Sequence, residues 1–174
     1  MNPPKGEAAF LQLFDENSAA LFRFAYRLTG SAADAEDIVQ ECFLGLMRPT
    51  CSCDPKRAPL RTYLFGVVRN QSLKRRRQTD PPGDSASHVQ TPESEVLRAE
   101  LQDVVAQAVM QLPDTQREVL ILAHYEQMPL AEIAQVTQLE LGAVKSRLQR
   151  ARASLKETLA AWAPARSEKA ERKI

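Results

Sequence analysis

Glycine, aromatic residues and cysteine are all scarce in this chain of 174 residues. It has only six glycines, and aromatic residues make up 6% of the sequence. This composition favours helices. Glycines are few, and the many Ala, Leu, Gln, Arg and Glu residues lose little side-chain rotamer freedom in a helix. The chain has three cysteines, and this odd number argues against a disulfide framework and fits a reducing compartment.

Long apolar runs and catalytic motifs are also missing. No apolar run approaches the ~18 residues that a membrane span needs. The N-terminal sequence MNPPKGEAAF lacks the basic start and apolar stretch of a signal peptide, so we expect a cytoplasmic protein. There is no glycine-rich phosphate loop, no nucleophile with a base in sequence reach and no paired-carboxylate arrangement. We therefore expect neither an enzyme nor a bound cofactor.

The chain divides at residues 79–95, TDPPGDSASHVQTPESE, which contain three prolines, four acids and no Lys or Arg. This composition is typical of a flexible, solvated linker. Strand alternation is absent on both sides of it. The sequence thus predicts an all-α protein of two small helical domains, residues 1–78 and 96–160. The tail, residues 161–174, is expected to be disordered.

Apolar spacing and end signals place the helices. Gly30 should stop the first one, since glycine adopts the left-handed conformation of a helix end. Thr115 and Glu118 have the spacing of a capping box. The predicted helices are about Ala8–Leu28, Ser31–Met47, Pro59–Arg77, Glu95–Gln111, one from Thr115, one after Pro129, and Gly142–Ala160.

The strongest functional signal is LAEIAQVTQLELGAVKSRLQRARASL, residues 130–155. Its apolar residues have helix-turn-helix spacing, with Val144 and Leu148 anchoring the second helix. Residues 141–160 hold five basic residues and one acid. A helix that enters a major groove needs short or amide side chains towards base edges and basic ones towards phosphates. The alternative is a solvated basic face on a bundle helix.

A second signal is LRTYLFGVVRNQSLKRRR, residues 60–77, with six basic residues and no acid. On a helical wheel Thr62, Phe65, Arg69 and Leu73 face away from the apolar stripe. An exposed aromatic beside arginines suits single-stranded nucleic acid, because bases stack on rings. The alternative is that Phe65 packs against a neighbouring helix.

A third signal is SAADAEDIVQECF, residues 31–43, with four acids and no base. Asp34, Asp37 and Glu41 fall on one side of the predicted helix. Acids in a first turn often only complement the helix dipole, which explains the first two but leaves Glu41 unexplained.

In this order the three segments resemble the extracytoplasmic-function sigma factors of the sigma-70 family. DAEDIVQECFLGL is similar to the region-two polymerase-binding motif, residues 60–77 to the promoter-melting helix, and residues 112–152 to region four. The resemblance implies a sigma factor that binds RNA polymerase core through the clamp helices of the largest subunit and the flap of the second largest. It also implies promoter DNA as a partner, and usually an anti-sigma factor.

The resemblance also implies roles for particular residues. Polymerase binding falls to Asp34, Asp37, Gln40 and Glu41. Melting and recognition of the −10 element fall to Arg61, Tyr63, Phe65, Arg69 and Asn70. Recognition of the −35 element falls to Lys145, Ser146, Arg147, Gln149 and Arg150. The chain departs from the family at Gln138, which must fit a turn that favours glycine, and at Glu140, which brings a negative charge near DNA.

Cys51, Cys53 and His88 are the candidates for a zinc or redox site. Their spacing is not a standard zinc pattern and no second pair exists, so we expect no metal. The family uses the loop around Cys51 and Cys53 to extract and recognise a flipped promoter base.

Two other functions compete with the sigma factor. A helix-turn-helix regulator that acts on duplex DNA without polymerase explains residues 96–160 but leaves the acidic segment without a role. An enzyme with a DNA-binding appendage, such as a nuclease, needs a metal-binding acidic cluster, and Asp34–Glu41 is the only candidate.

Overall fold

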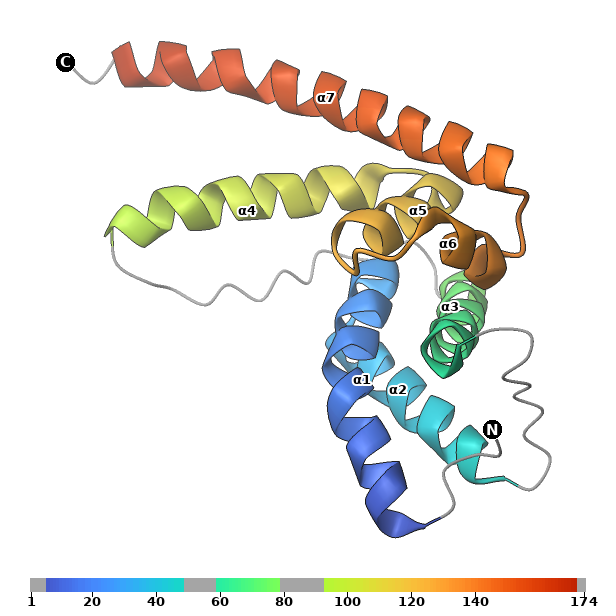
Figure 1. Cartoon of the computed structure of the whole chain (residues 1–174). Coiled ribbons are helices and arrows are strands. Elements are labelled where there is room, and N and C mark those ends of the chain that lie inside the picture. The colour runs from blue at the N-terminus through green and yellow to red at the C-terminus, as the bar shows by residue number, and fades with distance from the viewer. Residues whose placement is uncertain (1–5, 49–58, 79–92, 172–174) are drawn as a thin grey trace.

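A computed structural model describes residues 6–48, 59–78 and 93–171, with side chains described for residues 6–48, 59–77 and 102–160. Within these ranges the chain forms seven helices and no strand, so the all-α prediction is confirmed (Figure 1). No helix among the described residues has both the length and the apolar character needed to cross a membrane.

The first three helices pack against one another as a small bundle (Figure 1). They are α1 (Glu7–Thr29), α2 (Ala32–Met47) and α3 (Leu60–Gln78). Gly30 ends α1 in the left-handed conformation, with φ of 77°, and its N–H donates to Tyr26 O. Ser31 then caps α2 by accepting a hydrogen bond from Asp34 N, so two adjacent residues turn the chain from one helix into the next.

The second half contains α4 (Glu93–Gln111), α5 (Asp114–His124), α6 (Leu130–Thr137) and α7 (Leu141–Glu171). α4 and α7 run side by side, and α6 and α7 form the predicted helix-turn-helix. Ile133, Val144 and Leu148 are buried between them, as their spacing predicted. Gln138 ends α6 with φ of 57° and ψ of 41°, so this glutamine occupies the left-handed conformation that favours glycine.

A buried arginine joins α4 to α5. Arg117 donates to the carbonyl oxygens of Val109 and Leu112, at 3.1 and 2.8 Å, and also to that of Met110. These carbonyls lie at the C-terminal end of α4, where the usual hydrogen bonds of the helix interior run out, and that of Val109 also accepts from Leu112 N at 3.2 Å. Burial lowers the pKa of Arg117 to about 10, which still leaves the guanidinium charged at neutral pH.

The helices differ from the predicted ranges in three details. α5 begins at Asp114, so its N-cap is Pro113, whose side chain has no atom that can accept a hydrogen bond, and Glu118 binds arginines instead of completing a capping box. α4 begins at Glu93, inside the predicted linker. α7 continues to Glu171 through the tail expected to be disordered, a segment rich in the helix formers Ala, Glu, Lys and Arg. The rest of the linker, residues 79–92, lies outside the described residues.

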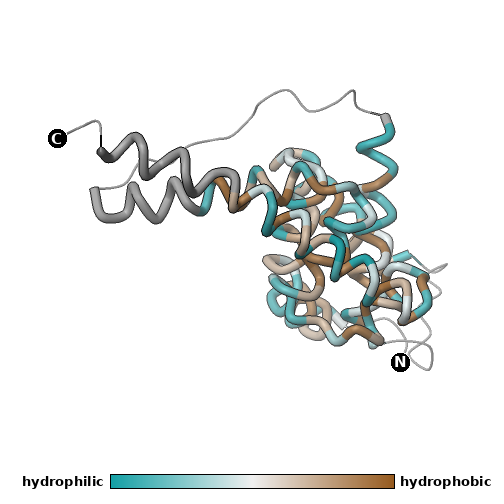
Figure 2. Tube along the Cα trace, turned by 90° about the horizontal axis from the view of Figure 1, so that it is seen from above, coloured by the Kyte–Doolittle hydropathy of each residue, from teal (hydrophilic) through white to brown (hydrophobic). Residues whose placement is uncertain are grey.

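The two halves are packed together. One cluster of buried apolar residues runs from Leu21 in α1 to Ala151 in α7. α3 packs on α6, and α1 packs on α5. Figure 2 shows polar and apolar residues interspersed along the helices, as expected where each helix buries one face. α3 therefore has neighbours from its own bundle on one side and from the second half on the other.

Candidate nucleic-acid interface

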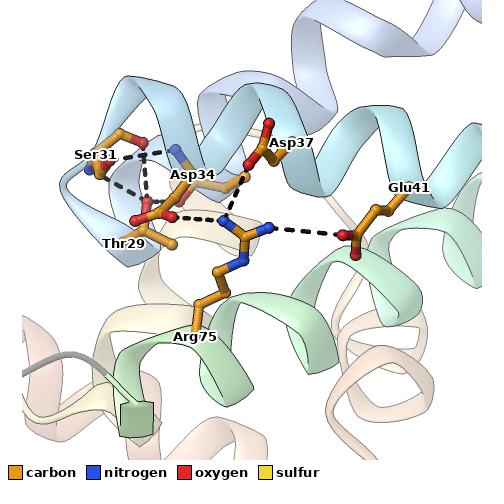
Figure 3. A network of polar contacts seen from close by, with 7 residues as sticks. Thr29, Ser31, Asp34, Asp37, Glu41 and Arg75 are labelled. Carbon is orange, nitrogen blue, oxygen red and sulfur yellow. Dashed lines mark hydrogen bonds and ion pairs between the residues drawn. The ribbon is translucent and has the colours of Figure 1, made fainter.

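Three carboxylates of α2 surround one guanidinium of α3. Arg75 Nη1 donates to Asp34 Oδ1 at 2.7 Å and to Asp37 Oδ2 at 3.2 Å, and Arg75 Nη2 lies 3.6 Å from Glu41 Oε1. Figure 3 shows this arrangement. The acids are three and four residues apart, which puts them on one side of the helix. We refer to Asp34, Asp37 and Glu41 as the acidic face.

The acidic face is accessible although it already binds an arginine. The side chains of Asp37 and Glu41 are 59% and 58% exposed, and Gln40 on the same helix is exposed. The hydrogen bond to Asp34 is the main cause that raises the pKa of Arg75. The face thus has the geometry to bind a guanidinium and keeps room for another cation.

The basic helix α3 carries four of its five predicted DNA residues at or near a polar surface. Asn70 is exposed and its Oδ1 accepts from Arg69 Nη1 at 3.3 Å. Arg61 is 45% exposed, while Tyr63 is partly buried. Arg69 is bound by Glu118 of α5, at 2.6 Å from Nε to Oε2 and 3.2 Å from Nη2 to Oε1.

Phe65 is the exception, and the prediction that it faces solvent is wrong. Its ring is fully buried and lies 5.2 Å from the ring of Phe24, centroid to centroid. Arg61 lies over the same ring, with Cζ 5.3 Å from the centroid. The wheel failed because α3 is covered on more than one side. Thr62, expected beside Phe65 on the free face, is also buried.

A basic hollow of about 440 Å³ lies along the far part of α3. Its lining residues are Arg69, Asn70, Leu73, Lys74 and Arg77. Three cations and an amide around one depression are the donors that phosphate oxygens accept. The hollow thus extends the predicted DNA surface of α3 towards its C-terminal end.

The second helix of the helix-turn-helix, α7, exposes the predicted combination of side chains. Lys145, Ser146, Gln149 and Arg150 are all exposed, opposite the buried Val144. Arg150 Nη2 hydrogen-bonds Ser146 Oγ at 3.1 Å, one turn apart on the surface. This face can donate to and accept from base edges.

Arg147 does not share that surface. Its side chain is 25% exposed, and Nη1 lies 3.5 Å from Oε1 of Glu118, which is 1% exposed. The pair joins α7 to α5 within the second half of the chain. In this arrangement Arg147 faces the interior, unlike the other four residues predicted to contact the −35 element.

Sequence reasoning missed Arg75 and Glu118. In the sequence Arg75 is only one of six basic residues in the segment 60–77, and Glu118 has only the spacing of a capping box. Neither residue stands out by charge in its own segment, since Arg75 lies within the basic run of residues 74–77 and Glu118 directly follows Arg117. The sequence alone does not identify partners that lie 29 to 49 residues away along the chain.

Among the described residues no group of three or more His, Cys, Asp and Glu is arranged to hold a metal ion. Cys51, Cys53 and His88, and the loop expected to hold a flipped base, lie outside the described residues. The acidic face, the one acidic segment that the nuclease alternative relied on, binds the guanidinium of Arg75.

Comparisons with known proteins converge on one family. The family model for sigma-70 region 2 matches residues 13–81, and that for sigma-70 region 4 matches residues 102–155. The ECF RNA polymerase sigma factor SigL of Mycobacterium tuberculosis is 37% identical over 161 residues, which cover 88% of this chain and 90% of that protein. SigW of Bacillus subtilis is 28% identical over 167 residues, covering 87% and 89%.

Solved structures give the same result. CnrH in complex with the cytosolic domain of CnrY has a TM-score of 0.71 and 29% identity, and the match covers 90% of this chain and 91% of that one. The sigma factor RpoE of Bartonella quintana, bound to the anti-sigma factor NepR, has a TM-score of 0.72 and 25% identity over 87% and 96%. Both likenesses span the two halves of the chain.

Proposed function

Because this chain belongs to the extracytoplasmic-function sigma factors of the sigma-70 family, and so is an alternative sigma factor that directs transcription initiation by RNA polymerase, we propose how its surfaces divide that work. Residues 1–78 act as region 2, residues 96–160 as region 4, and residues 79–95 as the connection between them. The observation that carries the proposal is the acidic face, since a duplex-binding regulator without polymerase has no use for it.

The acidic face, with Gln40, binds the clamp helices of the polymerase's largest subunit. Its support is chemical: three carboxylates already bind the guanidinium of Arg75, so an arginine of a partner finds a matching set of acceptors. Charge complementarity of this kind mainly sets the association rate and the choice of partner. Asp37 and Glu41, the more exposed acids, are the residues best placed for it.

The test is competition for core polymerase against a labelled sigma factor. Asp37→Arg should weaken binding several-fold at low salt, and the loss should shrink as salt screens the charge. Glu36→Arg is the matched control, because Glu36 is exposed on the same helix but lies outside the acidic face. Equal losses for the two variants, or no loss for Asp37→Arg, would contradict the assignment.

Region 2 binds the −10 element through Arg61, Tyr63, Arg69 and Asn70, assisted by the basic hollow. Phe65 is left out of this set because its ring belongs to the core. Region 4 binds the −35 element through Lys145, Ser146, Gln149 and Arg150, and Arg147 holds the helix that presents them. Phosphate contacts set position, and base contacts set sequence.

Two further elements complete the proposal. The protein acts in the cytoplasm, where its polymerase and promoters are. It has an anti-sigma partner, since the similar structures CnrH and RpoE are described as complexes with CnrY and with the anti-sigma factor NepR. Purification of the tagged protein from its native host, followed by identification of stoichiometric partners, tests both polymerase and anti-sigma binding.

A further inference from the structure

An exposed leucine lies at the start of the second helix of the helix-turn-helix. Leu141 is the first residue of α7, and its side chain is 42% exposed. Of the large apolar side chains described in α7, it is the one that is exposed rather than buried or half-buried. Leu139, two positions earlier, packs against the core. The first of these two leucines therefore serves the fold, while the second faces solvent.

The residues around Leu141 carry no positive charge for a phosphate. Residues 138–144, QLELGAV, contain no Lys or Arg, and their one acid, Glu140, is exposed. Cations that can meet the DNA backbone come later on the same helix, at Lys145 and Arg150. The start of α7 therefore suits the edge of a base better than it suits the backbone.

One base presents an apolar group in the major groove. Thymine has a C5-methyl group there, whereas the other three bases present hydrogen-bonding groups. In helix-turn-helix proteins the first residues of the recognition helix contact base edges. We propose that Leu141 selects a thymine in the −35 element by packing on its methyl group. The inference deepens the proposed function and rests on it, because it assumes that the α7 face binds the −35 element.

Leu141 lies too far from the other α7 residues to share their base pair. Gln149 is eight residues further along the helix, a rise of about 12 Å. Base pairs follow one another at about 3.4 Å along the duplex, so the two side chains meet different base pairs. A substitution at Leu141 should therefore change the preference at one base pair and leave the preferences due to Gln149 and Arg150 in place.

The test removes a single methyl group from the DNA. Holoenzyme reconstituted with this chain first selects its preferred −35 sequence from a library of random duplexes. Each thymine of that sequence is then replaced by deoxyuridine, one at a time, which keeps the base pair and removes only the methyl group. At one position this change should weaken binding of the wild-type holoenzyme about fourfold, the value of one buried methyl-sized group. Holoenzyme with Leu141→Ala should bind the thymine and uracil duplexes equally well.

Two further substitutions of similar size separate apolar contact from bulk. Leu141→Met keeps an apolar side chain and should retain the discrimination between thymine and uracil. Leu141→Gln has a side chain of nearly the same length but polar, and should lose it. The matched control is Leu11→Ala, since Leu11 is an exposed leucine of α1 outside both proposed DNA surfaces, and it should discriminate as the wild type does.

Two outcomes would overturn the inference. The first is a selected −35 sequence in which no thymine can lose its methyl group with an effect on binding. The second is a methyl effect that persists undiminished in Leu141→Ala. Failure of the proposed function is detected separately: Gln149→Ala with Arg150→Ala would then leave the selected −35 sequence unchanged, a result that does not depend on the methyl group.

Discussion

The basic helix of region 2 and the recognition helix of region 4 look alike in sequence but lie in different surroundings. In α7 one side, with Val144 and Leu148, is buried and the opposite side is exposed. In α3 the buried residues include Leu64 and Val68 on the predicted stripe and also Phe65 on the side expected to be free. A wheel separates two faces correctly only when a helix is covered from one direction.

The comparison has a functional side. In the structure the α7 face is exposed, whereas part of the proposed DNA surface of α3, at Arg69, is in contact with region 4. Arginines on the two helices also have different partners. Arg150 is exposed and bonded only locally to Ser146, but Arg69 is committed to the buried Glu118.

Among substitutions that test the difference in burial between α3 and α7, the largest expected effect is on the stability of the fold. Phe65→Ala should lower the free energy of unfolding by about 3–5 kcal/mol, because it removes a fully buried ring packed on Phe24. Urea denaturation followed by circular dichroism measures it. Phe14→Ala, at a ring that is 38% exposed, should cost clearly less. A loss below 1 kcal/mol for Phe65→Ala would mean that the ring is not in the core.

The next effect is on DNA binding through α7. Gln149→Ala or Arg150→Ala should weaken holoenzyme binding to promoter duplex by about 1–3 kcal/mol, the value of a good base contact. The free energy of unfolding should change by less than about 0.5 kcal/mol, since both side chains are on the surface. Electrophoretic mobility shifts with and without the −35 element measure the first effect. Lys156→Ala, exposed further along α7, should leave the preference for the element unchanged.

A smaller effect is expected at the turn that precedes the α7 face. Gln138→Gly should raise the free energy of unfolding by about 1 kcal/mol, because a non-glycine residue in the left-handed conformation is strained by roughly that amount. Gln135→Gly should have the opposite effect and lower the free energy of unfolding. Gln135 is exposed inside α6, where glycine costs about 0.5–1 kcal/mol. Thermal unfolding of the two variants should move the midpoint in opposite directions.

The smallest effect concerns pH. Glu126 is 5% exposed at the junction of the two regions, and burial raises its pKa above the ordinary value of 4.5. The folded protein thus holds this proton more tightly than the unfolded chain. Its contribution favours folding at low pH and is lost as pH rises from about 4.5 through the raised pKa. Glu126→Gln should flatten the pH dependence of the unfolding midpoint in that window, whereas Glu157→Gln on the surface should leave it unchanged.

Local features of the fold were predictable from sequence because they depend on near neighbours. Gly30, Pro129 and the spacing of Ile133, Val144 and Leu148 each act within a turn or two of helix, and the structure has them as expected. The acidic face was predictable in the same way, since three acids on one side of a helix need no distant partner to be recognised.

Contacts between the regions were not predictable. Glu118 has the sequence spacing of a helix cap. It turns inward because it forms ion pairs with Arg69 of α3 and Arg147 of α7, which are distant in the sequence. Phe65 was placed on the wrong side because α1 covers this side of α3 as well, with the ring of Phe24 against that of Phe65. Patterns of one helix carry no information on which other helix will meet it.

The distance along the chain between Arg69 and Glu118 sets a delay during synthesis. The two residues are 49 positions apart, and Glu118 is made second. At about 5–20 residues per second, α3 leaves the ribosome several seconds before the carboxylate that binds its arginine. A nascent region 2 thus passes through an interval in which its basic surface is bare in the presence of messenger RNA and ribosomal RNA, and that interval ends only when α5 has emerged.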